Sequence, residues 1–152
     1  MKSLLFIFLL IVSIVSGYYC GFNYCREGQV TIQEDDGCSC VEENKSEVKI
    51  TSALMGTWED GSRGGDTFMS VEYIIINNGA KDLRNIFIVP NETLSIRDSL
   101  YSDDSIWNII INNGGLTLPY YQNTINSNQC YKFGFIIKSK TIPSLKVASI
   151  GY

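Results

Sequence analysis

In this 152-residue chain, several aromatic residues lie beside turns, and their types and positions favour binding of a ligand. Trp58 lies in the Gly-rich stretch GTWEDGSRGG, and Trp107 follows the polar segment YSDDSI. Tyr120 and Tyr121 come directly after Pro119. A ring at a strand–loop junction can be buried in the core, but an exposed ring offers a flat apolar face to a ligand. Several rings at such junctions favour a ring-lined surface over unrelated core positions.

Catalytic and metal-binding side chains are scarce. The chain contains no histidine, which excludes Ser-His-Asp and Cys-His catalytic groups and histidine-ligated zinc or copper. It also lacks the Gly-rich motifs that cradle phosphates. The doublet Asp103–Asp104 could serve a glycosidase, but adjacent acids in a loop are usually only solvated. The acids that flank the Gly-rich stretch 59–66 lack the spacing of an EF-hand, so we expect a hairpin loop there and no calcium site. The sequence therefore predicts no catalytic residue, no cofactor and no metal.

Four of the five cysteines crowd into a short segment: Cys20, Cys25, Cys38 and Cys40. In an oxidising compartment such a cluster is typical of disulfides. Cys38 and Cys40 should point apart in an extended stretch, so each is expected to pair with Cys20 or Cys25, which leaves two connectivities. A zinc site is the alternative, but the C-x-x-C spacing of structural zinc is missing. Cys130 lies in an apolar stretch and is expected to be a buried free thiol, with an intermolecular bridge as the alternative.

The first seventeen residues resemble a secretory leader. One lysine, an apolar run and a small-residue ending are typical of a cleaved signal peptide over residues 1–17. The apolar run is short for a membrane span, so an uncleaved anchor is the less favoured alternative. We expect a secreted, extracellular protein that starts near Tyr18 and has no membrane attachment after cleavage.

Charge divides the remaining chain into two parts. Residues 18–47, which we call the Cys-rich arm, account for the acidity of the chain, whose net charge is −4, because seven acids and Lys45 as the only base lie between Glu27 and Glu47. Residues 48–152 hold equal numbers of acids and bases. A neutral domain has no electrostatic footprint for nucleic acid or anionic membrane, but it can bind an uncharged ligand. Two Asn-x-Ser/Thr sequons, at Asn44 and Asn91, are expected to be glycosylated on exposed loops.

Residues 48–152 are predicted to form an antiparallel β-sandwich. Stretches rich in β-branched and aromatic residues alternate with turn clusters, and no long stretch has helical periodicity. The pattern predicts strands over 48–54, 67–77, 83–89, 107–111, 131–138 and 145–152. It also predicts a hairpin over 75–88 with Asn78–Gly79 in the turn. Phe87, Phe133 and Phe135 are expected in the core.

The order of motifs along residues 48–152 resembles carbohydrate-binding module family 49. The resemblance is carried by Thr57–Trp58 before the Gly-rich loop, a strand ending at Asn77, Leu83–Ile86, Ile106–Ile109, the Leu118–Tyr121 turn and the closing Phe133–Ile136 strand. That family is a β-sandwich attached to some plant glycoside hydrolase family 9 endoglucanases, and it occurs in small secreted proteins of cellulose-making amoebae. Its members bind cellulose and are not catalytic. The Cys-rich arm lies outside the resemblance.

The resemblance implies which rings bind. Trp58, Trp107 and Tyr121 would stack on glucan chains, with Tyr120 and Phe68 as weaker candidates. The sequence departs from the family at Tyr121, where a tryptophan is usual, in a strand that keeps fewer tyrosines, and at SNQC, where the family has a Pro-Gly turn.

Three functions are consistent with these observations. The favoured one is a secreted, non-catalytic protein that binds the polysaccharide cellulose or a related β-glucan through exposed rings. The second is an extracellular matrix or coat protein that is crosslinked, or joined to matrix protein partners, through the Cys-rich arm. The least favoured is a small glycoside hydrolase or a hydrolase inhibitor.

Overall fold

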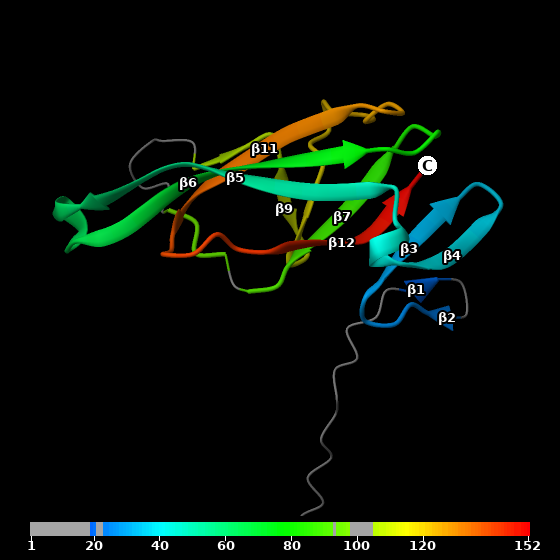
Figure 1. The fold of residues 1–152 in the computed structure, drawn as a ribbon, viewed down its shortest axis with the longest axis horizontal. Helices are drawn as coiled ribbons and strands as arrows, with labels where there is room; N and C mark the ends of the chain where they lie inside the picture. The colour runs from blue at the N-terminus through cyan, green and yellow to red at the C-terminus, as the bar shows by residue number, and fades with distance from the viewer. Residues whose placement is uncertain (1–18, 21–22, 93, 98–104) are drawn as a thin grey trace, which may run out of the picture.

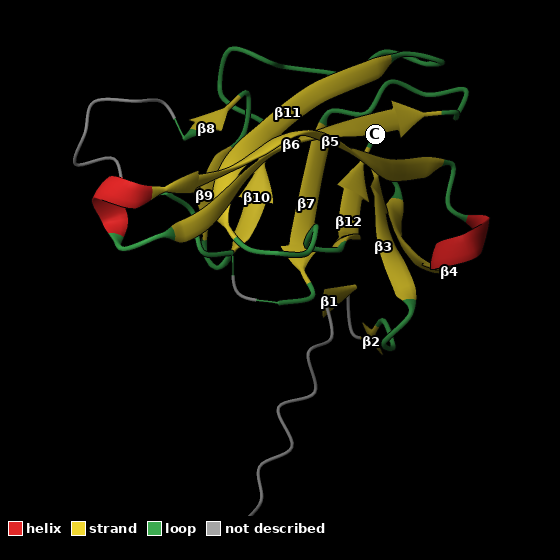
Figure 2. Ribbon diagram, turned by 60° about the vertical axis from the view of Figure 1, so that its left-hand side comes forward, coloured by secondary structure: helices red, strands yellow, loops and turns green. Residues whose placement is uncertain are grey.

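The computed structural model describes residues 19–20, 23–92, 94–97 and 105–152. Within this range the chain is all-β apart from two short 3-10 turns, and two sheets pack against each other (Figures 1 and 2). The predicted fold class is confirmed. The expected leader, residues 1–17, and the doublet Asp103–Asp104 lie outside the described residues.

The six-stranded sheet has the strand order β4–β3–β12–β7–β10–β9. Its strands are β3 (Gln29–Glu34), β4 (Gly37–Glu42), β7 (Asn85–Pro90), β9 (Ile110–Asn112), β10 (Gly115–Thr117) and β12 (Leu145–Gly151). The four-stranded sheet has the order β5–β6–β11–β8. Its strands are β5 (Val48–Asp60), β6 (Asp66–Asn77), β8 (Ile106–Trp107) and β11 (Cys130–Lys138). The remaining elements are the pair β1 (Tyr19–Cys20) and β2 (Asn23–Tyr24) and the 3-10 turns η1 (Glu43–Lys45) and η2 (Gly61–Arg63).

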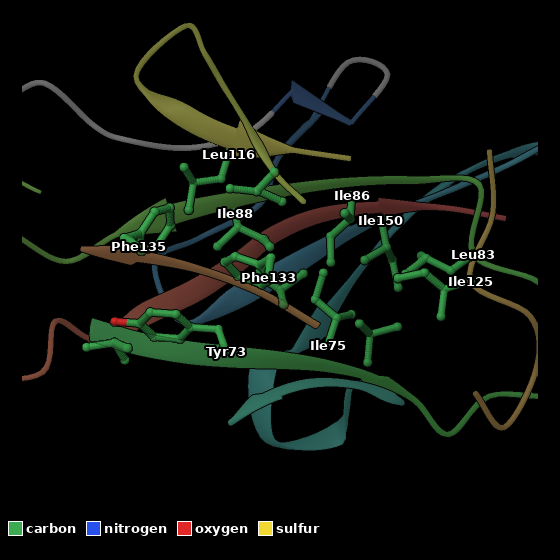
Figure 3. Packing of buried hydrophobic residues seen from close by; sticks show 14 of the residues in the cluster. Tyr73, Ile75, Leu83, Ile86, Ile88, Leu116, Ile125, Phe133, Phe135 and Ile150 are labelled. Atoms are coloured by element: carbon green, nitrogen blue, oxygen red, sulfur yellow. The ribbon is translucent and has the colours of Figure 1, made fainter. Parts of the chain in front are cut away.

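The core lies between the two sheets, as Figure 3 shows. Period-2 alternation on β11 turns Phe133 and Phe135 inward, where both are fully buried, while Lys132 stays exposed. Their rings meet the ring of Tyr73 on β6 at centroid distances of 5.4 and 5.6 Å. The Tyr73 hydroxyl donates a 2.8 Å hydrogen bond to the carbonyl of Pro143, so its polar end is satisfied inside the core. Burying each such side chain contributes about 1.5–3 kcal/mol. We call the face of each sheet that points away from this core its outer face.

The connection over residues 75–88 is not the predicted hairpin. β6 ends at Asn77 in one sheet and β7 begins at Asn85 in the other, so the chain crosses between the layers. The buried Asn77 amide donates to the carbonyls of Lys81 and Ile125 at 2.9 and 3.0 Å, and its oxygen accepts the Gly79 N–H at 3.1 Å. These bonds hold a wide turn in place of a tight one.

The Cys-rich arm is part of the sandwich. β3 pairs with β12 in parallel, and β4 pairs with β3. The arm therefore extends the six-stranded sheet by two strands that the composition did not predict. The other named strands pair antiparallel.

Both arm disulfides are closed within the chain, as the spacing predicted. The bonds join Cys20 to Cys38 and Cys25 to Cys40. Cys40 lies opposite Thr31 on the side of β3 that alternates away from the buried Val30, so the disulfides fasten β1 and β2 over the outer face of the six-stranded sheet. β1 and β2 thus cover the part of that face formed by β3 and β4, and the four arm thiols are used internally.

Cys130 is exposed, and the expectation of a buried thiol is wrong. Cys130 begins β11 directly opposite Ile76 of β6. The inward-facing positions of this strand are the odd-numbered ones, such as Phe133 and Phe135, and Cys130 is not among them. Alternation places it on the outer face at the end of the strand, although its neighbours are apolar.

No helix among the described residues is long and apolar enough to span a membrane.

Candidate functional site

Both tryptophans lie on the outer face of the four-stranded sheet. Trp107 is in register with Gly134 on β11, which pairs with Glu72 on β6. Trp58 on β5 is in register with Phe68. Residues that are directly opposite in a ladder share a face of the sheet. The rows of Trp107 and Trp58 are separated by four residues along β11 and by three strand spacings, roughly 13 Å along and roughly 14 Å across the sheet.

Trp107 lies across a glycine. A Cβ atom built on Gly134 would be only 2.2 Å from Cζ2 of the indole and 2.6 Å from its Cε2. The absence of a side chain at Gly134 therefore lets the ring rest directly on the strand. Trp107 is half-buried, so one part of it packs on the sheet and the rest meets solvent.

Tyr121 is brought to the same region by Asn108. The Asn108 amide donates a 3.1 Å bond to the carbonyl of Lys132, and its oxygen is 3.5 Å from the Tyr121 hydroxyl, which donates to it. Asn108 has a φ of 58°, in the left-handed region that asparagine tolerates, and this bends the chain directly after Trp107. The Tyr121 side chain is 60% exposed.

The Tyr131 hydroxyl lies close to that of Tyr121. Burial raises the pKa of the Tyr131 phenol to about 12, and the neighbouring Tyr121 hydroxyl adds to this shift. The Tyr131 oxygen is enclosed without a well-aligned hydrogen bond to any described group.

The two adjacent tyrosines contact each other but have different further neighbours. Pro119 to Gln122 form a turn closed by the Gln122 N–H to the Pro119 carbonyl at 2.9 Å, with Tyr120 and Tyr121 at its centre. Their rings meet edge to face at 5.6 Å with an interplanar angle of 78°. Tyr120, 88% exposed, lines a groove on the other sheet together with Phe87 of β7. Of the two, only Tyr121 contacts Asn108 beside Trp107.

Trp58 and Phe68 differ from the sequence-based expectation. Phe68 is only 3% exposed, so it offers no ring to a ligand and its candidacy as a binding residue is wrong. Its ring stacks on that of Trp58 at 6.2 Å and 24°, and the Arg97 guanidinium carbon is 5.7 Å from the centre of the Trp58 ring. Trp58 is therefore half-buried between intramolecular neighbours on the β5–β6 hairpin, which projects from the sandwich (Figure 1).

Two ion pairs lie on this outer face. Lys132 Nζ is 2.9 Å from Glu72 beside the Trp107 row, and Lys138 Nζ is 2.7 Å from Asp66 beside the Phe68 row. Each pair neutralises its own two charges beside a ring row. Both acids are engaged by lysines, which does not favour a general acid–base pair.

We define the aromatic face as Trp107, Asn108 and Tyr121, with Trp58 as an outlying ring on the same side of the sheet. A ring resting flat on a strand, an exposed phenol and an amide provide apolar contact and hydrogen bonding together. This arrangement suits an uncharged ligand that has both C–H surfaces and hydroxyls.

The family model "Carbohydrate binding domain CBM49" matches residues 48–140. The chain belongs to this carbohydrate-binding family. Two curated relatives from Dictyostelium discoideum match along the whole of both chains: "Stalk-specific protein A", 36% identical over 159 residues, and "Stalk-specific protein B", 35% identical over 159 residues. The predicted resemblance is confirmed, and the match begins at β5, after the Cys-rich arm.

Solved structures are similar only at a distance. One is a GH20 exo-β-N-acetylglucosaminidase from Vibrio harveyi, with a TM-score of 0.46, 13% identity, and coverage of 70% of this chain and 18% of that chain. Another is chitinase ChiA74 from Bacillus thuringiensis, with a TM-score of 0.41, 13% identity, and coverage of 79% and 17%. The chain thus spans less than a fifth of each enzyme.

Sequence reasoning missed Asn108, Gly134 and Tyr131 as parts of the candidate site. Gly134 carried a readable signal, because it interrupts an otherwise regular alternation on β11 at a position that faces outward. Asn108 carried a weaker one, as an asparagine directly after the exposed ring. Tyr131 could not be distinguished from the other inward residues of its strand.

Proposed function

We propose that this protein is secreted and binds cellulose or a related β-glucan through the aromatic face, without catalysing a reaction. The observation that carries the proposal is the indole of Trp107 resting on Gly134 beside the exposed Tyr121. A glucan chain has apolar C–H faces and a rim of hydroxyls. Flat rings can stack on the faces, and Asn108 can reach the rim.

The energetics favour an insoluble, repetitive ligand. A ring that buries about 50 Å² contributes on the order of 1 kcal/mol. Two or three rings then contribute roughly 2–4 kcal/mol, which corresponds to millimolar binding or weaker. A rigid fibre loses little conformational freedom, and it offers neighbouring sites for rebinding. Weak and reversible retention on a fibre surface is therefore expected.

A non-catalytic role is supported by the side chains available. The chain has no histidine, and the acids beside the aromatic face, Glu72 and Asp66, are ion-paired. Secretion is supported by the leader-like residues 1–17 and by the two disulfides, which persist in oxidising compartments.

The matrix-protein alternative no longer rests on crosslinking through the arm cysteines. The four arm cysteines are closed in intrachain bonds, so the arm offers no thiol for crosslinking in this state. The names of the stalk-specific relatives keep a structural extracellular role open for this chain. In our proposal, that role would be exerted through polysaccharide binding.

The test is a solid-phase panel of insoluble cellulose, chitin and xylan, with soluble β-glucans as competitors and a reducing-sugar assay of each supernatant. We expect retention on cellulose, release by excess soluble β-1,4-glucan, and no sugar production. Failure to bind any member of the panel would refute the proposal, and steady sugar release would show an enzyme.

A further inference from the structure

A groove of about 500 Å³ lies on the outer face of the six-stranded sheet, between the β7–β12 ladder and the turn that follows β10. It is separate from the aromatic face, which belongs to the other sheet. Its volume is in the range of small-ligand sites.

Phe87 forms the floor of this groove. A Cβ atom built on Gly115 of β10 would be 2.4 Å from Cζ of the Phe87 ring, so this ring also rests on a neighbouring strand where a glycine leaves room. Phe87 is in register with Ser149 of β12, and the buried Ile86 and Ile88 on either side point to the core. The sequence-based assignment of Phe87 to the core is therefore wrong, because alternation places it on the outer face, half-buried.

Tyr120 provides a second ring at the rim. It is the most exposed large hydrophobic side chain described, at 88%, and it lines the groove. The turn that holds both tyrosines thus places Tyr120 at the groove on the six-stranded sheet and Tyr121 beside Asn108, which follows β8 of the four-stranded sheet. Its exposed ring makes Tyr120 available for contact with a ligand at the rim.

The remaining lining is mixed and nearly uncharged, with Ile86, Leu118 and Pro119 as its apolar members. Amide and hydroxyl groups come from Asn85, Gln122, Asn123, Thr117 and Ser149. Arg84 is the one charged side chain among the described residues of the lining, and none is acidic. Two rings with a set of amides and hydroxyls match a neutral, polyhydroxylated ligand, and a concave site suits a single chain better than a flat crystal surface.

We propose that this groove is a second carbohydrate site that binds a single neutral polysaccharide chain or its soluble oligosaccharide. The protein would then hold an insoluble glucan surface on the aromatic face and a separate chain in the groove. The ligand class follows from membership of the CBM49 family, whereas the second site follows from the geometry of Phe87, Gly115 and Tyr120.

The experiment is a titration of the ¹⁵N-labelled, disulfide-intact protein with cellohexaose, and in parallel with the hexamers of xylose and N-acetylglucosamine. At least one of the three should shift the amide resonances of Asn85, Phe87, Thr117 and Asn123. Tyr120→Ala, which removes an exposed ring and leaves the fold intact, should raise the dissociation constant of that hexamer at least fivefold. An Asn123→Ala variant should weaken it as well.

The matched variant is Tyr121→Ala, which changes the adjacent ring. It should leave the hexamer dissociation constant that is read from the groove resonances within twofold, while lowering retention on insoluble cellulose. Tyr120→Ala should do the reverse. The second site is refuted if no hexamer shifts the groove resonances, or if hexamer binding follows Tyr121 and ignores Tyr120. Because the two variants have separate readouts, loss of the proposed cellulose binding and loss of the groove site are distinguishable.

Discussion

Gly134 decides whether an indole can rest on the four-stranded sheet. In a strand a glycine usually weakens packing, and here it marks close approach by the Trp107 ring. The same arrangement recurs with Phe87 over Gly115 on the other sheet. At the residue scale, the rings that remain available to a ligand are therefore defined by the glycines beneath them as much as by their own positions.

Gly134→Ala should displace Trp107 and destabilise the fold. The new methyl group would lie 2.2 Å from the indole and 2.4 Å from the backbone carbonyl of Val71, which cannot move aside cheaply. We expect a loss of roughly 1–3 kcal/mol in unfolding free energy, a shifted tryptophan emission and weaker retention on cellulose. Gly56→Ala is the matched control, because its Cβ would meet nothing within 4 Å. Unchanged thermal unfolding and emission in Gly134→Ala would contradict the geometry.

Alkaline pH should destabilise the protein through its enclosed tyrosines. Burial raises the pKa of Tyr73 to about 12 from its ordinary value of 10.0, with the charge of Glu92 adding to the shift, and Tyr131 is also raised to about 12. The folded state holds these phenols neutral, so their contribution is complete below pH 10 and is lost as the pH rises toward 12.

This dependence is measured by chemical denaturation at a series of pH values from 8 upward, alongside the absorbance of ionised tyrosine. Tyr131→Phe should flatten part of the alkaline decline. A wild-type stability that stays constant up to pH 12 would show that these hydroxyls are not held in the folded core.

At this scale, sequence patterns selected Trp107 and Tyr121 as candidate binding residues but could not separate them from Phe68. All are aromatic residues near loops, and the difference lies in what covers each ring. Phe68 is covered by Trp58, and Trp58 has the Arg97 guanidinium close to its ring. Such cover comes from residues distant in the chain, which no local pattern reports.

At the scale of elements, strands were predictable and their partners were not. The six stretches chosen from residues 48–152 all contain strands, and β5 runs on to Asp60 with a bulge near Met55. The predicted 75–88 hairpin failed because Asn78–Gly79 favours a tight turn locally, whereas the buried Asn77 amide fixes a crossing between sheets. The strands β3 and β4 were missed because charged and cysteine residues mask their pattern, and because β3 pairs in parallel with the distant β12.

The arm disulfides should stabilise the cover over the six-stranded sheet. Their sequence separations of 18 and 15 residues give loops for which a stabilisation of about 2–4 kcal/mol each is typical. A Cys25→Ser, Cys40→Ser variant should unfold at lower temperature and keep its retention on cellulose, because the aromatic face lies on the other sheet. Loss of cellulose retention in a variant that is still folded would show that the arm takes part in that site.

Cys130 provides an independent check of the same elements. In the folded protein a maleimide should add one label, at Cys130, and Cys130→Ser should add none. Peptide mapping should recover the Cys20–Cys38 and Cys25–Cys40 pairs. Labelling of several sites, or a cross-paired map, would mean that the arm is assembled differently.

At the scale of the whole molecule, we expect glycans at the two sequons to leave both candidate carbohydrate surfaces uncovered. Asn44 lies in η1 and Asn91 follows β7, and both are exposed. Glu43, beside Asn44, lines the same small cavity as Asn91, so the two sites share the arm end of the molecule.

Removing these glycans should therefore lower the mass and leave binding unchanged. In mass spectrometry an Asn44→Gln, Asn91→Gln variant should appear as one homogeneous species of lower mass. Its retention on cellulose should equal that of the wild type. If the variant is folded and no longer binds, the glycans or the arm end of the molecule belong to the ligand-binding surface.

The central claim is that the aromatic face binds glucan, and alanine at Trp107 tests it most directly when retention and thermal unfolding are measured on the same samples. Trp107→Ala and Tyr121→Ala should each reduce retention on insoluble cellulose about fivefold or more, since a ring contributes on the order of 1 kcal/mol. Tyr120→Ala should retain like the wild type. The melting temperature of Tyr121→Ala should be unchanged, and Trp107→Ala should remain folded with a modest decrease. If both variants are folded and bind cellulose as strongly as the wild type, the aromatic face is not the binding surface.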